Sequence, residues 1–175
     1  IKLAEDKNIA IFAPRFKRTS FISFNTLQMS TSSGIIRNDT NLYLHNSVDD
    51  LFKYIKSKFV LSQEFYDIYG HSAGAQFVHR YLLMSDNPKV NKAIAANAGW
   101  YTFLDGSNFP YGLSNPPINL NSSNVRNFLK MDFHVLIGSA DTDITSSVNQ
   151  SKGANNQGLN RFQRANNFFN YTKII

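Results

Sequence analysis

The chain has 175 residues, of which 42% are hydrophobic and 17% charged, and its formal net charge is +6. These values are ordinary for one soluble globular domain, and no apolar run reaches the roughly 20 residues that a membrane-spanning helix needs. The sequence contains no cysteine, which excludes disulfides, thiolate nucleophiles and cysteine-ligated zinc.

Lysines and arginines such as Lys53, Lys56, Lys58, Arg80, Lys89 and Lys92 are scattered singly, and the sequence shows no long basic stripe among aromatic residues. A solvated basic surface explains this pattern better than a nucleic-acid site, so we expect no nucleic-acid partner. The opening segment lacks a methionine, and Leu3, Ala4 and Asn8 are typical of the last turn of a helix. We therefore expect a chain that starts inside an element, which leaves its compartment open, and the sequence does not indicate an oligomeric state.

The first elements are read from apolar runs and helical spacing. Residues 8–13, an apolar run closed by Pro14, predict a buried strand. Residues 17–46 are rich in Ser, Thr and Asn and predict a long loop. Ser47 is a predicted N-cap, and apolar residues then recur at helical spacing as far as Phe59.

Strands and helices alternate along the rest of the chain. The predicted elements are a strand at 65–69, an amphipathic helix that ends before Pro88, a strand at 92–98, a helix at 123–130, a strand at 133–138 and a last helix with Leu159, Phe162, Ala165, Phe168 and Phe169 on one face. This order implies an α/β fold, with a mostly parallel sheet and helices on both faces. We expect one domain over residues 1–175, with ligands bound beyond the carboxyl ends of the strands.

The segment "DIYGHSAGAQFVHRY" carries the most informative motif, a serine at position 72 between Gly70 and Gly74. In a Gly-x-Ser-x-Gly turn between a strand and a helix, the serine is held exposed in a strained backbone conformation. Ala73 would then donate its backbone N–H to the oxyanion that forms during acyl transfer. The alternative is a tightly packed strand–helix turn without chemistry, but an apolar strand before and an amphipathic helix after favour the nucleophile.

The residues around this motif resemble a known family. Residues 67–78 look like the nucleophile elbow of α/β-hydrolases, with His71 as part of the elbow. "AANAGWYTFLDGSNFPYGL", followed by "FHVLIGSADTD", is similar to bacterial esterases of the poly(3-hydroxybutyrate) depolymerase-like branch. The resemblance implies ester hydrolysis by a Ser-Asp-His triad without cofactor or metal, and a small-molecule or polymeric ester as substrate. Ala75 departs from relatives that often carry a third glycine.

The triad acid is expected in the loop at 138–157, after a later strand than the one before the nucleophile. Asp141 has the position that the family uses, and its role would be to orient the imidazole. Asp143 is the rival, and Asp105 is a further candidate in the preceding loop.

The general base is missing from the pattern. His71 is adjacent to Ser72, His79 lies two helical turns beyond it, His134 is near the start of a strand, and His45 precedes a helix. We expect packing or surface roles for all four. The family pattern places the base beyond residue 175 and a second oxyanion donor before residue 1, so we expect truncation at both ends and little turnover from these residues alone.

An aromatic loop at 99–122 offers a candidate pocket. Trp100 and Tyr101 directly follow the third predicted strand, where they could bind the acyl or alcohol group, although packing beneath the loop is an equal alternative. The sequence thus predicts a serine esterase. A peptidase or thioesterase using the same nucleophile, and a non-catalytic binding protein of the same fold, stay open because the fold does not set the substrate.

Overall fold

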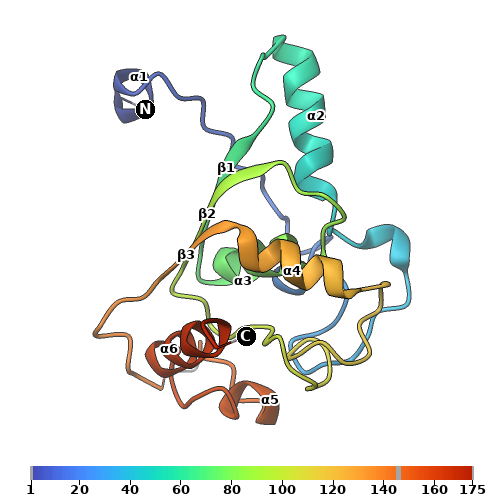
Figure 1. The fold of residues 1–175 in the computed structure, drawn as a ribbon, viewed down its shortest axis with the longest axis vertical. Coiled ribbons are helices and arrows are strands. Elements are labelled where there is room, and N and C mark those ends of the chain that lie inside the picture. Colours follow the sequence, from blue (N-terminus) through green and yellow to red (C-terminus); the bar gives the residue numbers. More distant parts are fainter. Residues whose placement is uncertain (1, 145–146, 175) are drawn as a thin grey trace.

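A three-stranded parallel sheet forms the centre of the computed structural model, which describes residues 2–144 and 147–174 (Figure 1). The strands are β1 (Tyr66–His71), β2 (Val90–Ala96) and β3 (Asp132–Leu136), in the spatial order β1-β2-β3. The parallel sheet and its connecting helices confirm the predicted α/β class.

Helices connect and flank these strands. They are α1 (Lys2–Asp6), α2 (Ser47–Phe59), α3 (Ala73–Met84), α4 (Ser122–Lys130), α5 (Lys152–Asn155) and α6 (Arg161–Thr172), with short 3₁₀ helices η1 (Phe24–Thr26) and η2 (Thr40–Leu42). Helix α1 projects from one end of the molecule, whereas α5 and α6 lie at the other (Figure 1). The N-cap of α2 is Asn46, one residue before the predicted Ser47.

The strand register separates the two faces of the sheet. Ile68, Ala93 and Phe133 are register partners across the three strands and belong to the hydrophobic core. Helix α3 packs against β1 and β2, and α4 packs against α3. Burial of this apolar face against helices supplies the main driving force for the fold.

The opposite face alternates with the first, because side chains of a strand point to either side in turn. Tyr69, Ile94 and His134 are partners in this second row. Tyr69 is 63% exposed, and Leu136 at the carboxyl end of β3 is 49% exposed. Helices α3 and α4 therefore cover one face, whereas Tyr69, His134 and Leu136 on the other face are exposed to solvent.

The predicted strand at residues 8–13 is wrong. The segment has no regular structure, and Ile9 and Ile11 are 54% and 57% exposed. A strand needs a neighbour for its backbone hydrogen bonds, and within the described residues β1, β2 and β3 pair only with one another. The β-branched residues at 8–13 are therefore not sufficient to form a strand.

Two further elements differ from the prediction. Leu159 precedes α6 and is 57% exposed, because the helix begins only at Arg161 after the N-cap Asn160. The four-residue α5 was not predicted at all. The long loop at 17–46 is confirmed, but Leu27 and Met29 within it are fully buried.

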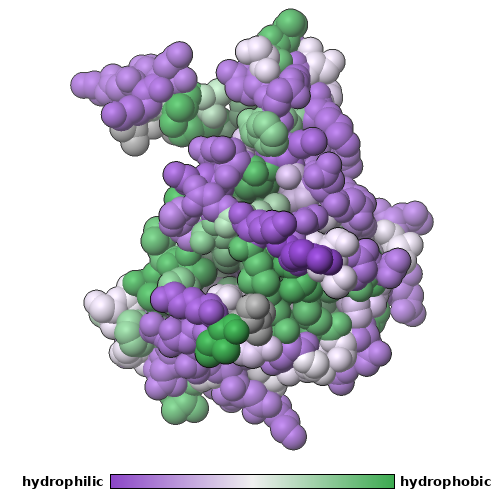
Figure 2. Space-filling view, in the orientation of Figure 1, coloured by the Kyte–Doolittle hydropathy of each residue, from purple (hydrophilic) through white to green (hydrophobic). Residues whose placement is uncertain are grey.

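Apolar surface gathers between α4 and α6, while α1 is mainly hydrophilic (Figure 2). Across residues 2–144 and 147–174, no helix has the length and apolarity that a membrane crossing demands.

Candidate functional site

Ser72 occupies a sharp turn between sheet and helix, and we call residues His71, Ser72 and Ala73 the serine corner. Strand β1 ends at His71, α3 begins at Ala73, and Ser72 between them has φ 55° and ψ −114°. A positive φ is uncommon for a residue with a side chain and marks a strained backbone. Two backbone hydrogen bonds maintain this conformation. The Ser72 N–H donates to Ala96 O at 2.9 Å, and the Ser72 carbonyl accepts from Gln76 N at 3.1 Å.

The polar groups at this corner are available to a ligand. Ser72 and Ala73 are half-buried, and within the described residues neither the Ser72 hydroxyl nor the Ala73 N–H has a hydrogen-bonding partner. The first N–H groups of a helix carry partial positive charge. The arrangement can therefore present a hydroxyl nucleophile beside a donor for developing negative charge.

The two flanking glycines serve different purposes. A Cβ atom on Gly70 would overlap the Gly74 carbonyl and come within 2.8 Å of Ala75 N. A Cβ on Gly74 would meet nothing within 4 Å. Only Gly70 is thus required by the close approach of strand and helix.

Asp141 lies in the loop after β3, at the same edge of the sheet as Ser72. Its Oδ2 accepts a hydrogen bond from Asn97 Nδ2 at 2.9 Å, and its Oδ1 accepts one from Arg161 NH1 at 3.1 Å. Asn97 directly follows Ala96, whose carbonyl binds the Ser72 N–H. The carboxylate is therefore connected to the serine corner through the end of β2, and it is held from two sides.

Asn97 and Arg161 were not predicted as site residues. The position of Asn97 directly after a strand, at the edge where ligands bind, is a signal that could have found it. Arg161 stands 20 residues from Asp141, and no pattern in the sequence connects the two.

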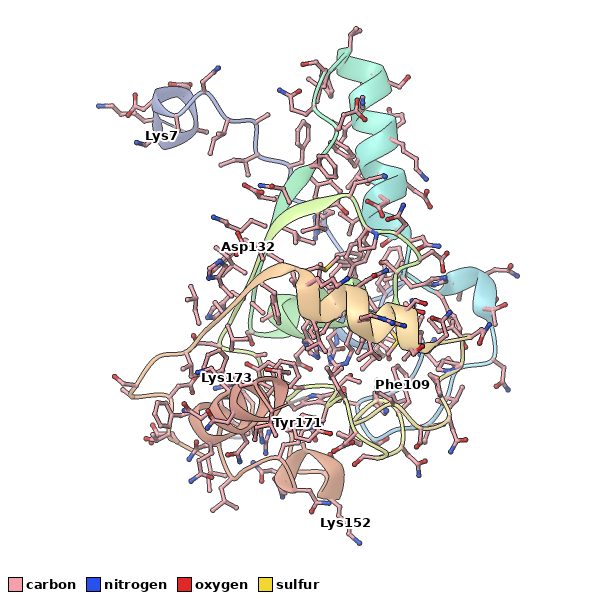
Figure 3. All side chains as sticks on the ribbon, in the orientation of Figure 1. Lys7, Phe109, Asp132, Lys152, Tyr171 and Lys173 are labelled. Atoms are coloured by element: carbon pink, nitrogen blue, oxygen red, sulfur yellow. The ribbon has the colours of Figure 1, made fainter. Side chains whose placement is uncertain are left out.

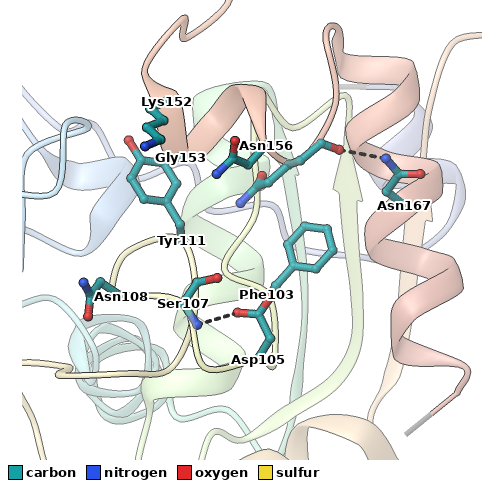
Figure 4. A pocket seen from close by; sticks show the side chains of 10 residues that line it. Phe103, Asp105, Ser107, Asn108, Tyr111, Lys152, Gly153, Asn156 and Asn167 are labelled. Carbon is teal, nitrogen blue, oxygen red and sulfur yellow. Dashed lines mark hydrogen bonds between the residues drawn. The ribbon is translucent and has the colours of Figure 1, made fainter.

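The alternative acids lie in different surroundings. Asp143 is exposed and has no partner within the described residues. Asp105 accepts a hydrogen bond from the Ser107 N–H at 2.9 Å inside its own loop and faces a separate cavity (Figure 4). Within the described residues, Asp141 alone of the three carboxylates is linked to the serine corner, through its hydrogen bond with Asn97.

His79 is buried and fully engaged. Its Nδ1–H donates to Ala75 O at 3.1 Å, and its Nε2 accepts from the Thr102 N–H at 3.0 Å. Burial, and secondarily the nearby Arg80 cation, hold the pKa of His79 well below its usual value. A neutral imidazole of fixed tautomer thus ties the aromatic loop to α3.

Within the described residues, none of the other histidine rings is hydrogen-bonded to the Ser72 hydroxyl. His134 Nε2 pairs at 2.6 Å with Asp132, which lies at the amino end of β3, far from Tyr171 and Lys152 in Figure 3. The carbonyl of His45 accepts from the Ser85 hydroxyl, at the opposite end of α3 from Ser72. His71, next to Ser72, is exposed.

Two cavities border the aromatic loop. The larger, of about 440 Å³, lies between this loop and the α5–α6 region (Figure 4), and we call it the Phe103 cavity. It is lined by Phe103, Asp105, Ser107, Asn108, Tyr111, Lys152, Gly153, Asn156, Gln157 and Asn167. None of these residues belongs to the serine corner, so size alone does not identify the site.

The smaller cavity, of about 290 Å³, includes in its lining a residue that is hydrogen-bonded to Ser72, and we call it the Trp100 cavity. It is lined by Asn25, Ser32, Gln76, Gly99, Trp100, Ser147, Val148 and Asn149. Gln76 binds the Ser72 carbonyl through its backbone, and Gly99 follows closely on Asn97. Trp100 thus lines a cavity near Ser72, although only 1% of it is exposed.

Tyr101 does not line either cavity. It is fully buried, and its ring stacks on Phe168 with centroids 4.4 Å apart. The side chain of Gln157 clamps its backbone, donating to Tyr101 O at 2.6 Å and accepting from Tyr101 N at 2.8 Å. The expectation of a substrate-pocket role is therefore not met for Tyr101, because its ring fills the space between α3 and α6.

Comparisons with known proteins give the fold context. No family model matches the sequence, and no curated protein does either. Among solved structures, the chain is similar to poly(aspartic acid) hydrolase-1 from Sphingomonas sp. KT-1, with a TM-score of 0.81 and 30% identity over 92% of this chain and 62% of that chain. It is also similar to LpqC, poly(3-hydroxybutyrate) depolymerase from Bordetella parapertussis, with a TM-score of 0.86 and 26% identity over 99% of this chain and 59% of that chain.

The chain thus spans about three fifths of the length of each matched structure. These likenesses confirm the resemblance to hydrolases of the poly(3-hydroxybutyrate) depolymerase-like branch.

Proposed function

We propose that this protein is a serine hydrolase that cleaves carboxylic esters, with Ser72 as the nucleophile. The observation that carries the proposal is the backbone of Ser72, which combines φ 55° with a free, partly exposed hydroxyl at the start of α3. A residue held in a strained conformation by its surroundings is characteristic of functional sites. A serine needed only for capping would bond the helix N–H groups, and Ser72 makes no such side-chain bond.

The remaining roles follow from the positions of neighbouring groups. The Ser72 oxygen attacks the ester carbonyl carbon and gives its proton to an imidazole, and the Ala73 N–H binds the resulting oxyanion. The alcohol leaves with that proton, and water then releases the acid from the acyl-serine. Asp141 orients the imidazole, which we assign to a histidine outside residues 1–175 because none of the rings of His45, His71, His79 and His134 is hydrogen-bonded to the Ser72 hydroxyl.

The matched proteins support hydrolysis of a polymer. One is named a poly(3-hydroxybutyrate) depolymerase, which favours a polymeric ester as substrate. The other is named a poly(aspartic acid) hydrolase. This name favours, as the second candidate function, cleavage of an amide bond by the same nucleophile. Comparison of kcat/KM for an ester and an amide of the same acid would show which of these two functions the protein prefers.

A fluorophosphonate probe tests the nucleophile directly on the complete protein. We expect the probe to label the natural protein and to lose at least about 100-fold in labelling rate with Ser72→Ala, because removal of a nucleophile costs several orders of magnitude. Ser122→Ala, which removes an exposed hydroxyl at the start of α4, is the matched control and retains labelling.

Two results would contradict the proposal. Absence of labelling in the natural protein would favour a non-catalytic binding protein of the same fold. Equal labelling of Ser72→Ala would place the nucleophile elsewhere.

A further inference from the structure

Two buried arginines stand behind the wall of the Trp100 cavity. Arg80 and Arg164 are both fully buried. Within residues 2–144 and 147–174, neither forms an ion pair with a carboxylate. Buried charges in proteins are normally paired, so two unpaired guanidinium groups around one cavity require an explanation.

Arg80 contacts the wall from α3. Its NH1 donates to Asn25 O at 2.8 Å and to Gln76 O at 3.1 Å, and its guanidinium carbon lies 3.9 Å from the centre of the Trp100 ring. Its NH2 has no hydrogen-bonding partner. Burial lowers the pKa of Arg80 to about 9, so the side chain remains a cation at neutral pH.

Arg164 contacts the same wall from α6. Its NH1 donates to Gly99 O at 2.8 Å, and its NH2 donates to Asn149 O at 2.9 Å. Of the eight residues that line the cavity, three therefore touch Arg80 and two touch Arg164. Five of the eight lining residues are thus in direct contact with one of the two cations.

No acidic side chain lines this cavity to offset the charge. Asp141, the carboxylate linked to the serine corner, is already paired with Arg161 at 3.1 Å. In a poorly solvated wall, the field of a cation is stronger than in water, so the cavity attracts negative charge. Gln76 bonds Asn25 through its Oε1, which leaves its amide N–H groups as donors beside the cavity.

We propose that the Trp100 cavity binds a carboxylate of the substrate, so that the protein prefers substrates with a negative charge near the bond that is cleaved. The proposal rests on the proposed role of Ser72, because Gln76 in the cavity wall bonds the Ser72 carbonyl through its backbone. The cavity of about 290 Å³ suits a short acyl group that ends in a carboxylate.

A pair of esters with equal chain length tests the preference. The complete protein is assayed with p-nitrophenyl butyrate and with the mono-p-nitrophenyl ester of succinic acid. We expect kcat/KM to be about 10- to 100-fold higher for the succinate ester, the range for hydrogen bonds to charged groups. A ratio near one, or a preference for butyrate, would overturn the proposal.

Gln76→Glu places a negative charge in the cavity with almost no change of shape. The variant is expected to lower the succinate-to-butyrate ratio at least about tenfold. Asn119→Asp adds the same charge at an exposed position outside the cavity and should leave the ratio unchanged. If Gln76→Glu does not fold, Asn149→Asp provides the same test from another residue that lines the cavity. If Gln76→Glu lowered kcat/KM for both esters and left their ratio constant, the proposal would be refuted. The two arginines would then only stabilise the loops around the cavity.

Direct binding separates this proposal from the proposed function. Succinate is titrated by calorimetry into Ser72→Ala, which cannot turn over an ester if Ser72 is the nucleophile. Binding that is weakened about tenfold by Gln76→Glu in the same background supports the anion site even if neither ester is hydrolysed. Undetectable binding at millimolar succinate, or binding unaffected by Gln76→Glu, refutes it.

Discussion

The sheet–helix unit and the loops around the site are stabilised by different interactions. In the unit formed by β1, α3, β2 and β3, the buried residues are mainly apolar, as with Leu83, Ala93 and Ala95. In the site loops, which we define as residues 97–121 and 147–160, buried backbone groups are bonded by side chains. Gly99, Tyr101 and Thr102 each have such a partner.

The difference follows from the backbone. Strands and helices satisfy their own N–H and C=O groups, so their side chains are free to be apolar. An irregular segment that is buried has no such internal partners, and a buried group without a hydrogen bond is costly. The loops therefore obtain their positions from polar side chains on α3 and α6 and from Gln157 just before α6, and these bonds determine the shape of both cavities.

The largest loss of stability is expected at the close contact between β1 and α3. Gly70→Ala would push a methyl group into the Gly74 carbonyl. Since backbone atoms cannot move as a flexible side chain can, we expect a loss of about 3 kcal/mol or more in the free energy of unfolding, at the upper end for overpacking. Urea unfolding measures it.

Gly74→Ala is the matched control, because a Cβ at that position meets nothing. It should be neutral or stabilise the protein by up to about 1 kcal/mol, as alanine favours helices over glycine. If Gly70→Ala were tolerated as well as Gly74→Ala, the close approach of strand and helix would not be a constraint.

The same contrast explains how much could be predicted from the sequence. The turn around Ser72 and the helices α2, α3 and α4 were predicted because their signals lie within a few residues of one another. Residues 8–13 were mispredicted because strand formation depends on a neighbour that local sequence does not specify.

Long-range polar bonds were also beyond sequence reasoning. His79 reaches Thr102 across 23 positions, and Gln157 reaches Tyr101 across 56. The position of Asp141 in the loop after a strand could be predicted, but the two side chains that bond its carboxylate could not. The burial of Tyr101 depends in the same way on Phe168 of a distant helix.

Breaking one polar clamp should weaken the site loops. Gln157→Leu keeps the volume but removes both hydrogen bonds to the Tyr101 backbone, leaving a buried N–H and C=O unpaired. We expect a loss of about 2–3 kcal/mol in unfolding free energy, with faster hydrogen exchange over the loops. Gln63→Leu, at an exposed position, should change stability by less than about 0.5 kcal/mol. A Gln157→Leu protein as stable as this control would show that water replaces the clamp at little cost.

The smallest effect is a pH dependence that His79 imposes on the same loops. Its folded-state pKa is lowered, mainly by burial, whereas an unfolded histidine titrates near about 6.5. Below that pH the unfolded state binds more protons than the folded state, so this contribution to stability is lost as the pH falls. Urea unfolding should show a decline that approaches about 1.4 kcal/mol per pH unit from this residue below about pH 6. His79→Gln can still donate to Ala75 O and accept from Thr102 N, so it should flatten that slope while the protein stays folded. An unchanged slope in His79→Gln would mean that the imidazole is protonated without breaking its bond to the aromatic loop.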